Sequence, residues 1–78
     1  MAIAGFLAHA ESGQSERLEA RLAGMPGIST FGVHRGCYIV AVAEAPGERM
    51  EDLLGQARSL DGMLALYVTS MTIEDELP

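Results

Sequence analysis

The chain has 78 residues, which suffices for one domain with one core, because so short a chain buries only about 60–65% of the surface it exposes when unfolded. Hydrophobic residues make up 49% of the sequence and charged residues 21%, a composition typical of globular proteins that excludes a disordered chain. The formal net charge of −6 argues against a nucleic-acid partner and favours a cationic one, since phosphate backbones are bound by basic surfaces.

The single cysteine and the N-terminal residues indicate the cellular compartment of the protein. Cys37 is the only cysteine, so the sequence allows no internal disulfide and no paired metal or redox motif, and a reducing cytoplasm is the expected compartment. The longest apolar run is far shorter than the roughly 18 residues of a transmembrane helix. Met1 and Ala2 supply no basic region of a secretory signal, so we interpret residues 2–10 as a strand.

The first helix follows that strand. The stretch "ESGQS" at residues 11–15 reads as a loop, in which Ser15 is a candidate N-cap. Leu18 and Leu22 lie four residues apart on one helix face, and Gly24 with Pro26 ends the helix.

A hairpin, a second helix and a last strand complete the order. Alternation over 28–34 and the run "CYIVAVAEA" at 37–45 predict two strands joined by a glycine-containing turn. Apolar residues then recur at helical spacing up to Asp61 and Gly62, which end the second helix: Met50, Leu53, Leu54, Ala57 and Leu60. Residues 63–73 form the last predicted strand of a single domain over 1–73, and 74–78 are an acidic tail.

An internal repeat indicates the fold. The stretch "MPGI" at 25–28 matches "LDGM" at 60–63, so two β-α-β halves repeat. This order predicts a ferredoxin-like α+β fold, a split βαβ (βαββαβ) with a four-stranded antiparallel sheet and both helices on one face. Right-handed crossovers place the first and third strands centrally, which gives the order 4-1-3-2.

Alternation along the strands predicts which residues face the helices. Both helices pack on one face, and the internal repeat assigns the parity of each strand, so that we expect these strand residues to face the helices: Ile3, Gly5, Leu7, Phe31, Val33, Val40, Val42, Leu64, Leu66 and Val68. Gly5 would give a helix room to approach.

The opposite parity carries no charge over its inner part, although a solvated antiparallel face normally does. An uncovered apolar face of this size indicates an interaction site, either for a second copy of the chain or for an apolar peptide. The predicted peptide contacts are Ala4, Phe6, Ala8, Thr30, Gly32, Ile39, Ala41, Tyr67, Thr69 and Met71. The predicted acidic rim consists of Glu44, Glu48, Glu74 and Asp75.

Residues that carry catalytic chemistry are sparse. Neither His9 nor His34 has a serine, cysteine or carboxylate at a catalytic spacing, and Cys37 reads as a small hydrophobic residue. The loop "ESGQSE" lacks the glycine spacing of a phosphate-binding loop, and no cysteine pair follows the first strand. The sequence therefore predicts a binding protein without enzymatic activity, metal or cofactor.

Four stretches span nearly the whole chain: "AIAGFLAHA", "LAGMPGISTFGV", "GCYIVAVAEA" and "SLDGMLALYVTSMTIEDE". In order and spacing they resemble the NapD family of cytoplasmic chaperones for the periplasmic nitrate reductase. The resemblance implies a maturation chaperone that binds the twin-arginine signal peptide of the catalytic subunit and delays export until the molybdenum cofactor is loaded. The alternative is a small-molecule-binding regulatory domain of the ACT or AsnC-like kind, which would dimerise through its sheet and bind an amino acid.

Overall fold

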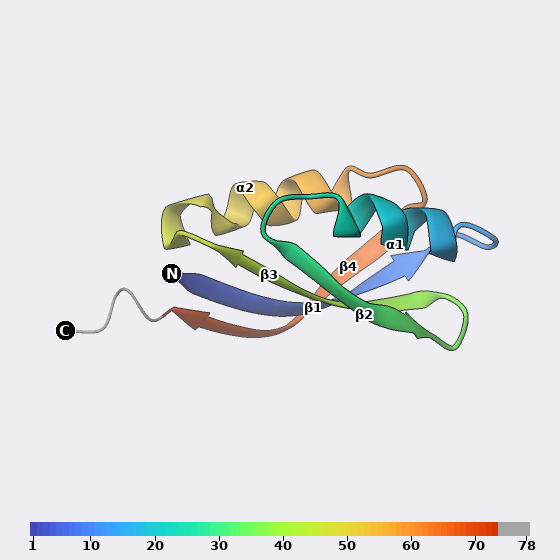
Figure 1. Ribbon diagram of the computed structural model, residues 1–78, viewed down its shortest axis with the longest axis horizontal. Coiled ribbons are helices and arrows are strands. Elements are labelled where there is room, and N and C mark those ends of the chain that lie inside the picture. The colour runs from blue at the N-terminus through green and yellow to red at the C-terminus, as the bar shows by residue number, and fades with distance from the viewer. Residues whose placement is uncertain (74–78) are drawn as a thin grey trace.

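A computed structural model describes residues 1–73 and contains six elements in the predicted order (Figure 1). They are β1 (Ala2–Ala10), α1 (Ser15–Ala23), β2 (Ile28–His34), β3 (Tyr38–Ala45), α2 (Gly47–Arg58) and β4 (Met63–Ile73). The predicted tail, with its rim residues Glu74 and Asp75, lies outside the described residues.

The four strands form one antiparallel sheet in the order β2-β3-β1-β4, with β1 hydrogen-bonded to both β3 and β4. Both helices lie on the same side of this sheet (Figure 1). The ferredoxin-like fold and the strand order predicted from the sequence are therefore confirmed.

The helices begin close to the predicted positions and bury the predicted leucines. The N-cap of α1 is Gln14, so the prediction that Ser15 caps this helix is wrong by one residue, and the Ser15 hydroxyl instead donates to the Gly36 carbonyl in the β2–β3 turn. Leu18 and Leu22 are fully buried in α1. In α2 the buried residues are Met50, Leu54 and Ala57, and Leu53 is half-buried.

The core is made by the strand parity that we expected to be open. In β1 the residues buried beneath the helices are Ala2, Ala4, Phe6, Ala8 and Ala10. Four of these pair directly with buried residues of β3: Ala2 with Ala45, Ala4 with Ala43, Phe6 with Ala41 and Ala8 with Ile39. The predicted assignment of the two sheet faces is therefore wrong for β1 and β3. In β4 it is confirmed for Leu66, which pairs with Ala8 and is buried in the core.

Side-chain size explains the reversal. The helices contribute Leu18, Leu22, Met50 and Leu54, and the strands contribute several alanines together with Phe6 and Ile39, so large and small side chains fill the core together. The larger aliphatic residues Ile3 and Leu7 lie on the opposite face and are only half-buried. Gly5 also lies there, where an added Cβ would come within 2.9 Å of the Ser70 hydroxyl of β4 rather than against a helix.

Irregularities in the two edge strands interrupt the alternation. The register of β2 shifts between Thr30 and Val33, where Gly32 has a φ of 107°, so Phe31 and Val33 do not share a face as strict alternation predicts. In β4 the register shifts opposite Gly5 and Phe6 and again opposite His9 and Ala10. Strict alternation therefore predicts which face a side chain lies on over only parts of β2 and β4.

Candidate functional site: the uncovered sheet face

The sheet face opposite the helices, here called the open face, is organised in four rows across β3, β1 and β4. The register aligns these residues, in the order β3, β1, β4: Tyr38, His9, Ala65; Val40, Leu7, Tyr67; Val42, Gly5, Ser70; and Glu44, Ile3, Thr72. From β2, Ser29 and His34 join the face through their pairing with Val42 and Tyr38, and Phe31 joins it by alternation from Thr30.

Large apolar side chains on this face remain in solvent. Phe31 is 66% exposed, Tyr67 53% and Val40 40%. The row Val40, Leu7, Tyr67 crosses three strands, and neither helix covers it because both pack on the other side (Figure 1). Apolar side chains gathered on an uncovered face are typical of a protein–protein contact surface.

The two ends of the open face differ in chemistry. At one end the rings of His9 and Tyr38 stack, with centroids 4.7 Å apart and planes inclined by 22°. At the other end Glu44, paired with Ile3, is the one charged residue that the register places on the described part of this face. An elongated ligand with a cationic end and an apolar segment would therefore meet complementary surfaces if it lay along the strands and crossed the rows.

Most of the ten predicted peptide contacts do not lie on the open face. Five of them are in the helix-covered core: Ala4, Phe6, Ala8, Ile39 and Ala41. Thr30 pairs with Ala41 and Met71 with Ala4, so both point to the helix side, although Met71 is exposed. Gly32 and Thr69 lie at the register shifts, and Tyr67 is the predicted contact that the register places on the open face.

The predicted rim is only partly described. Glu44 lies on the open face, and Glu48 is exposed in the first turn of α2, on the helix side of the sheet. The residues that took the place of the predicted contacts are Leu7, Val40 and Val42. Their signal was available in the sequence, because Val40 and Val42 share a parity with the charged Glu44, and charged side chains are almost never buried.

Two kinds of feature, a cluster of metal-ligating side chains and a membrane-spanning helix, are not found in the described residues. No group of three or more histidine, cysteine, aspartate or glutamate side chains in residues 1–73 could hold a metal ion. Cys37 is a free, half-buried thiol in the turn directly before β3. No helix within the described residues is long and apolar enough to cross a membrane.

Comparison with known proteins supports the fold. No protein-family model matches the sequence. No curated protein matches it either. The solution structure of the Tat proofreading chaperone protein NapD from E. coli is similar, with a TM-score of 0.81 and 18% identity over 97% of this chain and 82% of that chain. The crystal structure of a hypothetical protein from Pyrococcus horikoshii has a TM-score of 0.79 and 16% identity over 97% and 94% of the two chains. The fold thus resembles that of the NapD chaperone, and at these identities the likeness extends to the fold alone.

Proposed function

We propose that this protein is a non-enzymatic, cytoplasmic maturation chaperone that binds the twin-arginine signal peptide of a periplasmic nitrate reductase catalytic subunit. Binding would delay export until the molybdenum cofactor is loaded. Two findings support the proposal: the fold resembles that of a Tat proofreading chaperone, and the sheet has an uncovered apolar face. The second finding carries the argument, because it is a property of this chain's own residues.

Apolar contact would supply most of the affinity. The hydrophobic segment of a signal peptide would pack on the row Val40, Leu7, Tyr67 and on Phe31. Covering several hundred Å² of apolar surface contributes on the order of 10 kcal/mol at about 25 cal/mol per Å², before association and ordering costs remove much of it. The net binding free energy that remains is compatible with a reversible complex, which a chaperone needs.

Charge would orient the peptide and speed its encounter. The chain carries a net charge of −6, and Glu44 lies at one end of the open face. An exposed arginine–carboxylate pair is worth only about 0.2–1 kcal/mol, so this contact adds little affinity but favours the orientation with the arginines near Glu44.

An NMR titration of the isotopically labelled protein with a synthetic twin-arginine signal peptide tests the proposal. We expect saturable shifts at Leu7, Val40 and Tyr67, and none at the helix core residues Leu18 and Leu54. A control peptide keeps both arginines but carries serines in its hydrophobic segment, and it should bind at least tenfold more weakly. Shifts confined to the helices, or equal binding of both peptides, would contradict the proposal.

A second copy of the chain is the competing occupant of the open face. Sedimentation of the free protein over a range of concentrations separates the two cases. A monomer that binds the peptide supports the chaperone, and a stable dimer in which Val40 and Tyr67 are protected and the peptide does not bind contradicts it.

A further inference from the structure

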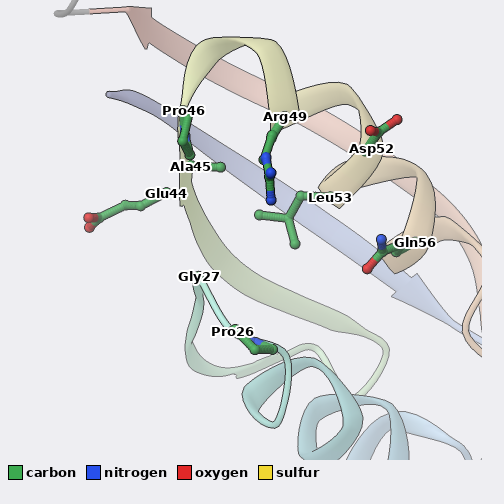
Figure 2. A pocket seen from close by; sticks show the side chains of 9 residues that line it. All are labelled: Pro26, Gly27, Glu44, Ala45, Pro46, Arg49, Asp52, Leu53 and Gln56. Atoms are coloured by element: carbon green, nitrogen blue, oxygen red, sulfur yellow. The ribbon is translucent and has the colours of Figure 1, made fainter.

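A groove adjoins the Glu44 end of β3, where α2 passes the loop that precedes β2 (Figure 2). It has a volume of about 540 Å³ and is lined by Pro26, Gly27, Glu44, Ala45, Pro46, Arg49, Asp52, Leu53 and Gln56. Sites for small molecules commonly enclose roughly 300–1,000 Å³, so a ligand the size of an amino acid derivative fits.

The wall of this groove requires a glycine. Gly27 has a φ of 91°, and its carbonyl accepts a 2.7 Å hydrogen bond from the Glu44 amide. A Cβ at this position would lie 2.6 Å from the Glu44 carbonyl oxygen and 3.4 Å from Leu53 Cδ2. The absence of a side chain therefore brings the loop against β3 and keeps the wall close to α2.

The interior of the groove combines hydrogen-bond donors with an apolar floor. Figure 2 shows the Arg49 guanidinium extending from α2 into the space between the helix and the loop, beside Leu53, with the Gln56 amide on the same side of the helix. The carboxylates of Glu44 and Asp52 point away from this space. The acidic residues that line the groove thus leave its donors accessible.

The Arg49 guanidinium is without a partner inside the described part of the chain. Its side chain forms no hydrogen bond or ion pair with residues 1–73. By contrast, Arg21 Nη1 donates to the Asp61 carbonyl at 2.8 Å. With respect to residues 1–73, the Arg49 guanidinium in the groove is therefore available for an external acceptor.

We propose that this groove binds a terminal carboxylate carried on a small apolar body. The Arg49 guanidinium would donate two parallel hydrogen bonds to the carboxylate, the geometry that this side chain favours, and the Gln56 amide would donate a third. Leu53 and Pro26 would pack against the apolar body. A peptide C-terminus and a free N-acylated amino acid share this chemistry, and the site does not depend on the proposed peptide site on the open face.

N-acetyl-leucine and N-acetyl-leucinamide are the probes that test this site by NMR titration. They differ only in the carboxylate, and neither carries an ammonium group that Glu44 or Asp52 could attract. We expect the acid to shift Gly27, Leu53 and Gln56 with saturation below about 10 mM, and the amide to bind at least tenfold more weakly. An acetylated tripeptide ending in leucine, compared with N-acetyl-leucine, separates the sources: tighter tripeptide binding identifies a peptide terminus, and equal binding a free small molecule.

Arg49→Gln should weaken binding of the acid about tenfold, and Arg58→Gln is the matched control, since Arg58 is exposed in the last turn of the same helix and outside the groove. Both variants should melt like the parent protein because both arginines are exposed. Equal shifts with acid and amide, equal loss in both variants, or no saturable shift would overturn the proposal.

Discussion

Aspartate substitutions at Ile39 and Val40 test the assignment of the two sheet faces, because these neighbours in β3 point to opposite sides. Ile39 is 0% exposed and pairs with Ala8 in the core, whereas Val40 pairs with Leu7 on the open face. We expect Ile39→Asp to unfold the protein and Val40→Asp to leave it folded but deficient in peptide binding.

The expected stabilities follow from burial. Removing a fully buried isoleucine side chain costs about 2–5 kcal/mol, and an unpaired buried carboxylate adds to this. A domain of 78 residues has a total stability of about 4–12 kcal/mol. Ile39→Asp therefore consumes most or all of it, whereas Val40→Asp changes strand propensity and packing by about 1 kcal/mol.

The binding loss for Val40→Asp has two parts. Covering the exposed 40% of this valine contributes about 0.6–1.2 kcal/mol, taking 1.5–3 kcal/mol for a whole side chain, which is roughly a three- to eightfold change in Kd. Desolvating the new carboxylate beneath an apolar segment raises the loss beyond tenfold. Val40→Thr, similar in shape and uncharged, should retain most of the binding.

Urea denaturation and isothermal titration calorimetry with a twin-arginine peptide measure both effects. If Ile39→Asp were as stable as the parent protein, the assignment of the faces would be refuted. If Val40→Asp were folded and bound the peptide normally, the peptide site would lie elsewhere.

Three further predictions concern Gly27, Glu44 and Tyr67. Gly27→Ala should lower the free energy of unfolding by about 2–4 kcal/mol, because Gly27 has a positive φ and an added Cβ would clash with β3. Gly55→Ala should raise the free energy of unfolding by about 0.5–1 kcal/mol, because Gly55 lies in α2 and an added Cβ would have nothing within 4 Å. Thermal melts measure both changes. Glu44→Gln should raise the Kd for the peptide less than about fivefold, mainly through a slower association rate, and stopped-flow data should show that the difference disappears at high salt. Tyr67→Ala should raise this Kd about tenfold in calorimetry with unchanged helix content by circular dichroism, because its ring is half-exposed on the open face.

The elements and their order could be predicted from the sequence because each carries a local signal. Leu18 and Leu22 give helical spacing, Gly24 and Pro26 end the first helix, and the glycine-containing turn at 35–36 joins the hairpin. The echo of the first half in the second indicated the ferredoxin-like fold. These signals depend on neighbouring residues, and the structure confirms them.

The faces were harder to predict because both parities of β1 are apolar, and the signal at Glu44 lies in β3 only. We assigned Ile3 and Leu7 to the core, but packing depends on the volume that sheet and helices fill together, and here Phe6 and the alanines of the opposite parity fill it with the helices. The register shifts near Gly32 and Thr69 add a second obstacle, since alternation fails where a strand gains a residue.

The corrected open face also favours an external partner. The predicted open face included the large apolar residues Phe6 and Ile39, which the structure buries beneath the helices. The actual open face exposes Phe31, Val40 and Tyr67, while the alanines of β1 are buried beneath the helices. A chain selected for its own stability alone would gain by burying its larger apolar side chains and exposing polar ones. The surplus apolar area on the open face is consistent with a partner that covers it.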